Sequence, residues 1–236
     1  MEEYVITAEE LRKIPQQTPE WIVARRGRVT ASRCIDIVSK TKAGKYSASR
    51  YNYLMEKVSE HVTQRAAEHF VTPAMEIGIE RQPFAQAAYE VSQDCSVDSV
   101  GIVAHPTIEL FSCSPDGLVA DDGIVEYKCP TDRVHIEYLR DGVIPADYMP
   151  QLVAELAIMP ERQYVDFVSF NPNMPYGMQL FIRRLKRDEK QIAALETEVV
   201  SFLGELAEML QSLAQAVPIL GQNAPESQGS PIQEEV

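Results

Sequence analysis

The chain has 236 residues, of which 45% are apolar, and a formal net charge of −13. The apolar share suffices for one substantial core, and the length favours one domain over two. No apolar run approaches the roughly 20 residues of a spanning helix, and the start Met-Glu-Glu-Tyr lacks the basic residues that open a signal peptide. We therefore expect a cytoplasmic protein without a membrane partner.

Helical patterns dominate the first hundred residues. Thr7-Ala-Glu-Glu10 is a capping box, and Thr18-Pro19 is an N-cap followed by proline at the first helical position. Further helices are predicted over residues 32–39, 48–68 and 75–91, with a kink or a new start at Pro83. From there the hydrophobic spacing falls to two, which predicts strands over residues 99–104, 109–113, 117–120 and 124–129.

The second half of the chain returns to helix before two more strands. We predict helices over residues 132–140 and 147–159, strands over 164–170 and 177–185, and a long helix over 188–216. Residues 218–236 are rich in Gly, Gln, Pro, Ser and Glu, which predicts a disordered tail. The expected fold is a single α/β (α+β) domain over residues 1–217, with a mixed central β-sheet flanked by helices.

The charge is unevenly distributed along the chain. Residues 21–65 contain ten basic and three acidic side chains, a balance of +7, so the other 191 residues carry −20. The net charge alone argues against a nucleic-acid partner, but this asymmetry predicts a basic surface on one side of an acidic body. A solvated basic helix face is the alternative.

The strongest chemical signal lies between residues 112 and 130. A three-residue turn at Asp121-Asp122-Gly123, with Gly123 in the left-handed region, would pair Leu118 with Glu126 and set Asp116 opposite Lys128. In that register Asp116, Glu126 and Lys128 share one face, with the two carboxylates roughly 7 Å apart. An ordinary Pro-Asp-Gly turn and a solvated strand face are the competing interpretations.

Two carboxylates at that separation predict a site for one divalent cation. Few protein ligands and hard oxygen donors favour Mg²⁺, with Mn²⁺ as a substitute, and the carbonyl of Tyr127 could add a ligand. Such an ion suits phosphodiester cleavage, where it acts as template and Lewis acid. Lys128 could orient or deprotonate the attacking water or stabilise the transition state, and the sequence leaves these roles open.

The pattern Asp-x9-Glu-x-Lys, with its Asp in a Ser-Pro-Asp-Gly turn, resembles the PD-(D/E)XK nucleases. The surrounding motifs resemble the viral recombinases of the lambda exonuclease type, over roughly residues 18 to 190. The resemblance implies a restriction-endonuclease-like core. It also implies that Arg25 and Ser32, in the motif that begins at Trp21, hold the 5′ phosphate of DNA together with Ser114.

Two helical motifs extend the resemblance. Gly78-Ile-Glu-Arg-Gln82 is similar to a family motif whose acidic residue helps hold metal, but the residue at that position is the neutral Gln82. Gln82 remains a candidate ligand, Glu80 is a weaker substitute, and the number of metals stays open. Tyr148-Met-Pro-Gln151 is similar to the helix that places a Gln near the scissile phosphate, which implies a catalytic role for Gln151.

The resemblance implies a Mg²⁺-dependent 5′-to-3′ exonuclease that degrades one strand of linear duplex DNA to mononucleotides. The 3′ overhang would serve recombination by single-strand annealing. The implied partners are double-stranded DNA ends, an annealing recombinase and two further copies of the chain in a homotrimeric ring. The alternatives are an endonuclease or other recombination nuclease of the same fold, and a DNA-end binding protein without catalysis.

Overall fold

The computed structural model describes residues 6–67 and 72–216, so the predicted tail lies outside the described residues. The N-terminal part is mainly helical and contains α1 (Ala8–Lys13), α2 (Pro19–Arg25), β1 (Val29–Thr30), η1 (Ala31–Arg33), α3 (Cys34–Val38), α4 (Ala48–Thr63) and α5 (Pro73–Gln93). The predicted caps at Thr7 and Thr18 are present, and each side chain accepts a hydrogen bond from its first helical turn. Helix α5 continues through Pro83 without a new start.

Short strands follow the helices: β2 (Val97–Asp98), β3 (Val103–Ala104), β4 (Phe111–Cys113), β5 (Gly117–Val119) and β6 (Gly123–Lys128). The strand predicted over residues 99–104 is correct only at β3, since residues 99–102 are not a strand and β2, which precedes them, belongs to the other sheet. Between them, the amides of Gly101 and Ile102 donate to the carbonyls of Arg12 and Leu11. A Cβ on Gly101 would lie 2.3 Å from the carbonyl oxygen of Ile14, so only glycine allows this close approach to α1.

The rest of the chain completes the larger sheet with α6 (Asp132–Asp141), η2 (Ala146–Tyr148), α7 (Met149–Ile158), β7 (Tyr164–Phe170), η3 (Tyr176–Met178), β8 (Leu180–Lys186) and α8 (Glu189–Ala216). Five strands lie in the order β2-β5-β6-β7-β8, with β6 and β7 parallel and the other pairs antiparallel. A second sheet has the order β1-β4-β3. The expected mixed central sheet flanked by helices is thus confirmed.

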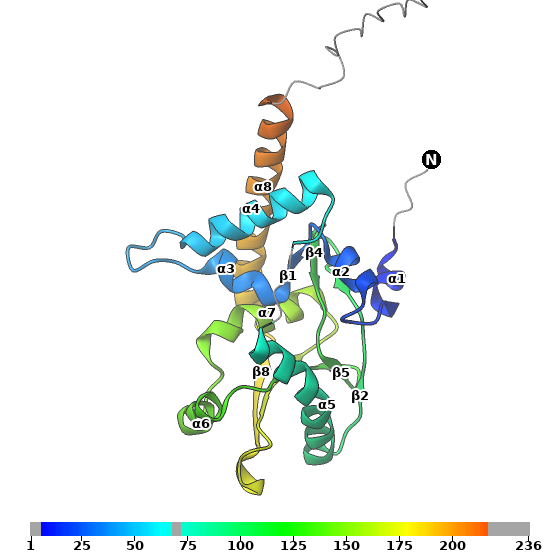
Figure 1. The fold of residues 1–236 in the computed structure, drawn as a ribbon, viewed down its shortest axis with the longest axis vertical. Coiled ribbons are helices and arrows are strands. Elements are labelled where there is room, and N and C mark those ends of the chain that lie inside the picture. The colour runs from blue at the N-terminus through cyan, green and yellow to red at the C-terminus, as the bar shows by residue number, and fades with distance from the viewer. Residues whose placement is uncertain (1–5, 68–71, 217–236) are drawn as a thin grey trace, which may run out of the picture.

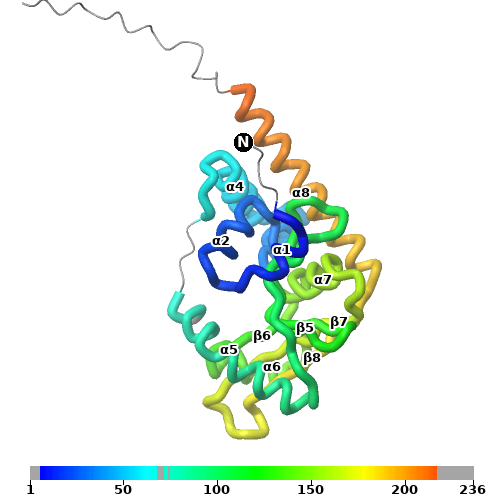
Figure 2. Tube along the Cα trace, turned by 90° about the vertical axis from the view of Figure 1, so that its right-hand side faces the viewer, coloured from blue at the N-terminus to red at the C-terminus, as the bar shows by residue number. Residues whose placement is uncertain are grey.

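Helices cover both faces of the five-stranded sheet. On one face, Ile124, Val165 and Phe167 join a core with α3, α4, α7 and α8. On the other face, Val125 and Tyr127 pack against α5. Figure 2 shows α1, α2 and α4 above the sheet, with α5 beside it. Because side chains alternate along a strand, Glu126 and Lys128 share the face of Ile124, as predicted.

The predicted register of the β5–β6 hairpin is wrong by two residues. Leu118 pairs with Ile124 and Val119 with Gly123, so the three loop residues are 120–122. Ala120, with φ of 46°, takes the left-handed conformation that was assigned to Gly123. Gly123 instead packs under the Tyr164 ring, where a Cβ would lie 2.4 Å from it. A shift of two keeps every side chain on its predicted face.

Helix α8 is the longest element and leaves the body at the end opposite to the β7–β8 connection (Figure 1). Its first five turns bury Ile192, Leu195, Val199, Phe202 and Leu206 in the core that α3, α4 and α7 share. None of the described helices has the length and apolar character that crossing a membrane would require.

Candidate active site

The end of β6 carries Glu126 and Lys128 on the face that α7 covers. Glu126 is 5% exposed, and its Oε1 accepts hydrogen bonds from Lys128 Nζ at 2.6 Å and Gln151 Nε2 at 2.5 Å. Lys128 Nζ also lies 3.4 Å from Gln151 Oε1 and 5.1 Å from the centroid of the Tyr148 ring. Strand β6 and helix α7 together hold an acid, an amine and an amide in mutual contact.

Asp116 joins this group from the turn that precedes β5. Its Oδ2 accepts the backbone N–H of Tyr127 at 2.7 Å, and its Oδ1 accepts Gln82 Nε2 at 3.0 Å. Continuing the observed register by one pair sets Asp116 opposite Glu126 instead of Lys128. The structure therefore brings Asp116, Glu126 and Lys128 together in a different pairing from the one predicted, and α5 adds Gln82.

The electrostatics of the cluster are dominated by closely spaced negative charge. Burial, followed by the charge of Glu126, raises the pKa of Asp116 to about 8. Burial alone would lower the pKa of Lys128, but the charges of Glu126 and Asp116 outweigh that effect and raise it. Lys128 is thus a permanent cation, whereas Asp116 holds its proton at neutral pH unless a further positive charge arrives.

The oxygen atoms present suit a divalent cation. Glu126 Oε2 is buried and has no hydrogen-bond partner in the described part of the chain. A buried acceptor of this kind carries a cost unless a ligand or an ion meets it. Within residues 6–67 and 72–216, no group of three His, Cys, Asp or Glu side chains converges as a metal site. An ion here would take two carboxylates and complete its shell with water and substrate, which is typical of Mg²⁺.

The site contains a third carboxyl group, that of Glu155, which is not among the residues predicted from the sequence. It is 1% exposed, its Oε1 accepts Gln151 Nε2 at 3.0 Å, and burial followed by the charge of Glu126 raises its pKa well above the ordinary range. Glu155 lies four residues after Gln151, so both side chains project from the same side of α7. A lone acidic residue within the apolar run Leu152–Ile158 was the signal that could have identified it.

The groups predicted to hold a 5′ phosphate lie beside this cluster. The Arg25 guanidinium stacks on the Trp21 ring at 3.9 Å, and among the described residues no side chain pairs with it as an ion pair or hydrogen-bond acceptor. Burial lowers the pKa of Arg25. Trp21 Nε1 donates to Ser114 Oγ at 3.0 Å, which leaves the hydroxyl hydrogen of Ser114 available to a ligand. Sequence analysis assigned Trp21 no role, although it is the only tryptophan.

A cavity of about 170 Å³ joins the two sets of side chains. Two groups of its lining residues concern us: Arg25, Ser32 and Ser114, which we call the phosphate wall, and Glu126, Lys128, Gln151 and Glu155, which we call the catalytic wall. Gln16, Trp21, Thr30 and Ala31 complete the lining. A larger cavity of about 540 Å³ opens beside Arg81 and Cys129 and is lined by none of the predicted site residues. We assign the site to the smaller cavity because it contains the hydrogen-bonded group of Glu126, Lys128 and Gln151 together with Arg25.

The structure corrects two of the expectations drawn from the sequence, and the first concerns Glu80. This residue is exposed, and two positions along α5 turn it about 200° away from Gln82, so it does not join the cluster.

The second correction concerns the basic segment, whose charge is partly neutralised inside the protein. Lys57 is paired with Glu60, Arg50 with Glu205, and Arg33 with Asp36 and Glu56. The predicted basic surface is therefore smaller than the count of ten residues implies.

Comparison with known proteins identifies the family to which the chain is similar. The model of the YqaJ-like viral recombinase domain matches residues 20–160. An alkaline exonuclease from Laribacter hongkongensis, LHK-Exo, is 40% identical over 84% of this chain and 97% of its own, with a TM-score of 0.78; its complex with dAMP gives 0.79. A phage-related exonuclease from Haemophilus somnus 129PT is 15% identical over 79% of this chain and 96% of its own, with a TM-score of 0.60, and shares the fold. A search of the curated proteins found no match.

The matched region contains Arg25, Gln82, Asp116, Lys128 and Gln151, so it spans both sides of the assigned cavity as well as more than half of the chain. The resemblance inferred from the sequence motifs is confirmed. The chain belongs to the YqaJ-like viral recombinase family, of the lambda exonuclease-like type.

Proposed function

We propose that the protein is a Mg²⁺-dependent 5′-to-3′ exonuclease that digests one strand of linear duplex DNA and releases mononucleotides. The observation that carries the proposal is the shared cavity. Arg25, Ser32 and Ser114 line one wall, and Glu126, Lys128 and Gln151 line the other. A terminal phosphate held on the first wall brings the first phosphodiester of that strand beside the second wall.

The groups on the first wall suit a phosphate in their chemistry. The Arg25 guanidinium presents a planar fork of donors that matches phosphate oxygens, and the hydroxyls of Ser32 and Ser114 add short hydrogen bonds. Arg25 is partly buried, and no acidic side chain of the described residues pairs with it directly. An incoming phosphate would therefore supply the close negative charge that this guanidinium lacks.

The groups on the second wall suit hydrolysis. Asp116 and Glu126 would hold Mg²⁺, with Gln82 and the Tyr127 carbonyl as further candidate ligands, and the ion would supply a template and Lewis acid. Lys128 adds a fixed positive charge that stabilises negative charge on the phosphate in the transition state. Gln151 contacts both Glu126 and Lys128 and orients them toward the scissile bond.

The relatives support the same activity. LHK-Exo is described as an alkaline exonuclease, and one of its structures contains dAMP, a mononucleotide. A site in which Asp116 has a pKa of about 8 would gain cation affinity, and with it activity, as the pH becomes alkaline. The trimeric ring, the annealing recombinase and the replacement of Mg²⁺ by Mn²⁺ stay predictions that follow from the family resemblance.

The decisive experiment compares linear and covalently closed circular duplex DNA during a Mg²⁺ titration. We expect mononucleotides from the linear duplex only, and none from Asp116→Asn. Nicked circles would instead establish an endonuclease. Binding to DNA ends without products at any Mg²⁺ or Mn²⁺ concentration would establish a non-catalytic end-binding protein.

A second experiment tests capture of the 5′ phosphate. The wild type should prefer a 5′-phosphorylated end to a 5′-hydroxyl end in kcat/KM, and Arg25→Ala should remove that preference. Arg26→Ala is the matched control, because the Arg26 guanidinium donates to the Gln64 carbonyl and does not line the cavity. A preference that survives in Arg25→Ala would exclude Arg25 from this role.

A further inference from the structure

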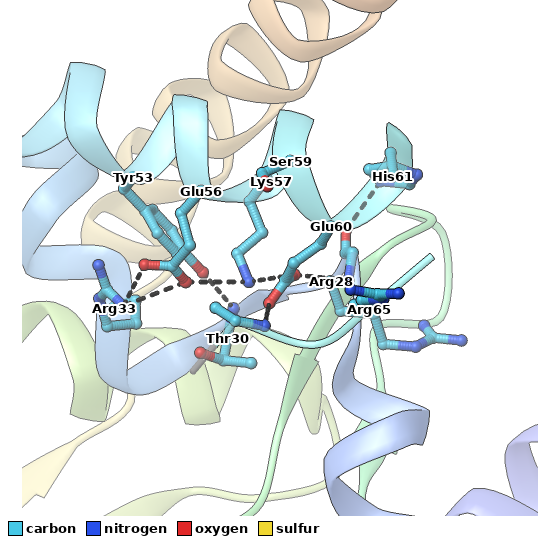
Figure 3. Close-up of polar contacts among 12 residues, drawn as sticks. Arg28, Thr30, Arg33, Tyr53, Glu56, Lys57, Ser59, Glu60, His61 and Arg65 are labelled. Atoms are coloured by element: carbon cyan, nitrogen blue, oxygen red, sulfur yellow. Dashed lines mark hydrogen bonds and ion pairs between the residues drawn. The ribbon is translucent and has the colours of Figure 1, made fainter. Parts of the chain in front are cut away.

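Two of the three residues of the phosphate wall, Arg25 and Ser32, belong to residues 25–32, a segment with little regular structure of its own. It contains the end of α2, the two-residue strand β1 and the start of η1. Figure 3 shows the side chains of α4 pointing toward this segment, with Tyr53, Glu56, Lys57, Glu60 and His61 arranged along the helix. The segment is therefore held in place from behind by one face of α4.

Glu60 makes the central contacts of this face. Its side chain is 4% exposed, and Oε2 accepts both Lys57 Nζ at 2.6 Å and the backbone N–H of Gly27 at 2.8 Å. The other oxygen, Oε1, accepts the backbone N–H of Ala67 at 3.0 Å. One buried carboxylate thus joins the turn that follows Arg25 to the segment that leads from α4 toward α5.

The turn at Gly27 has little freedom to differ from this arrangement. Gly27 has a φ of +72°, and a Cβ on it would lie 2.9 Å from the ring of His61. His61 Nε2 lies 3.2 Å from the Gly27 carbonyl oxygen. Glu60 therefore contacts the N–H of Gly27, and His61 contacts its carbonyl group. Glu60 and His61 together fix the chain two residues after Arg25.

The same face of α4 contacts the rest of the segment one turn further back. The Tyr53 hydroxyl accepts the backbone N–H of Thr30 at 3.2 Å, and Glu56 accepts Arg33 Nη1 at 3.0 Å. Lys57 Nζ lies 3.2 Å from Glu56 as well as 2.6 Å from Glu60, and so connects the two carboxylates. Ser32 lies between the points that Tyr53 and Glu56 hold.

Stability alone gives no reason for a buried ion pair at this place. An apolar pair of similar volume stabilises a fold as well or better. An apolar pair, however, cannot accept two backbone N–H groups from separate segments. Burial alone would raise the pKa of Glu60, but the bonds from Lys57, Ala67 and Gly27 outweigh it and lower the pKa, so the carboxylate is ionised and accepts at both oxygens.

We propose that Glu60, held by Lys57, is a positioning residue for the 5′-phosphate pocket and fixes the direction in which Arg25 faces the cavity. This rests on the proposed function, which gives Arg25 the terminal phosphate as its ligand. Glu60 does not line the cavity, and acts through the backbone of Gly27. Its contact with Ala67 also ties the pocket to the residues that follow α4.

The test measures the ratio of kcat/KM for 5′-phosphorylated and 5′-hydroxyl ends in Glu60→Leu and Glu60→Gln. Leucine offers no acceptor, and we expect the ratio to fall at least tenfold. Glutamine has one acceptor oxygen in place of two and must give up one backbone bond, so an intermediate ratio is expected. Glu205→Gln is the matched control: it weakens the ion pair with the buried Arg50 of α4, at the end of that helix that does not contact residues 25–32. Its ratio should equal that of the wild type.

A second measurement separates this proposal from the proposed function. Backbone amide exchange, followed by NMR, should show Gly27 and Ala67 protected in the wild type and in Glu205→Gln but not in Glu60→Leu. If Glu60→Leu lowers kcat/KM equally for 5′-phosphorylated and 5′-hydroxyl ends, its ratio stays at the value of the wild type and of Glu205→Gln. That result would overturn the positioning role. A wild type that does not distinguish the two ends would instead overturn phosphate capture, and the exchange data would then decide whether Glu60 holds the segment.

Discussion

The two walls of the cavity have opposite electrostatic needs. Beside the catalytic wall, Asp116 has a pKa raised to about 8 because burial and Glu126 disfavour its negative charge. On the phosphate wall, burial lowers the pKa of Arg25, which no described acidic side chain pairs with directly. One wall would be stabilised by a cation and the other by an anion. A metal ion would supply the positive charge, and the 5′ phosphate of a DNA terminus would supply the negative charge. The charges of each wall are therefore balanced only when the ligands of the proposed reaction are bound.

The walls also differ in how the chain builds them. The catalytic wall and its neighbour Asp116 come mainly from a single hairpin, in which residues 116–128 place two acids and an amine, and α7 adds Gln151 and Glu155. The phosphate wall depends on α4, whose Glu60 is 33 positions after the Gly27 that it holds. We therefore expect substitutions on the first wall to act directly on chemistry, and those behind the second wall to act through position.

The largest expected effect is that of Lys128→Ala. Removing a fixed charge that stabilises a transition state typically costs a hundredfold to a thousandfold, and we expect kcat on linear duplex to fall by about a thousandfold. Single-turnover digestion of an end-labelled duplex at saturating Mg²⁺ measures this. Lys186→Ala, which removes an exposed lysine from β8, is the control and should keep full activity. A loss of less than tenfold in Lys128→Ala would remove Lys128 from the chemistry.

The contrast between the walls also explains what the sequence could predict. Alternation along a strand placed Glu126 and Lys128 on one face even though the register was wrong by two residues, because such a shift preserves the face. The position of the turn was missed because Ala120, and not Gly123, adopts positive φ. That preference follows from the packing of Tyr164 on Gly123, a contact between residues 41 positions apart.

The phosphate wall and the helix α4 behind it were harder to predict, because they too depend on contacts between residues distant in sequence. The motif around Trp21 pointed to Arg25 and Ser32, but nothing local indicated that Lys57 and Glu60 would turn inward. Local charge counting treated Lys57 as part of a basic surface, whereas tertiary packing buries it. The separation of β2 from β3 depends likewise on contacts of Gly101 with α1. Interactions distant in sequence decided each of these outcomes.

A second prediction sharpens the electrostatic contrast through the pH dependence of Mg²⁺ binding. Asp116 must lose its proton to hold a cation, and its pKa without metal is about 8. Below that pH, protons compete with the ion, so Kd should rise about fivefold from pH 8 to pH 7 and about fiftyfold from pH 8 to pH 6. Isothermal titration calorimetry measures this dependence. Asp116→Asn should bind Mg²⁺ more weakly with little pH dependence, and a pH-independent Kd in the wild type would contradict the assignment.

A third prediction concerns Glu155. Burial, followed by the charge of Glu126, raises the pKa of its carboxyl group well above the ordinary range. The folded state keeps a proton that the unfolded chain loses near pH 4.3, so this group makes stability fall as the pH rises from there to its folded pKa. Its share of the slope is about 1.4 kcal/mol per pH unit. Glu155→Gln should remove that share while its amide oxygen still accepts Gln151 Nε2. Urea denaturation in EDTA at several pH values measures the slope, and an unchanged slope would mean that Glu155 is ionised in the folded protein.

The smallest expected effect is that of Gln82→Glu, which changes the charge beside the catalytic wall. Gln82 now donates a hydrogen bond to Asp116 at 3.0 Å; a glutamate there would replace that bond with like-charge repulsion until a cation arrives. We expect Mg²⁺ affinity to rise by about threefold to tenfold, and the free energy of unfolding in EDTA to fall by about 1–3 kcal/mol. Calorimetry and urea denaturation measure the two effects. Glu80→Gln is the control, because Glu80 is exposed and turned away from the cluster. Should Gln82→Glu leave metal affinity unchanged, Gln82 would be a hydrogen-bond donor to Asp116 and not a metal ligand, and the catalytic wall would hold its cation by Asp116 and Glu126 alone.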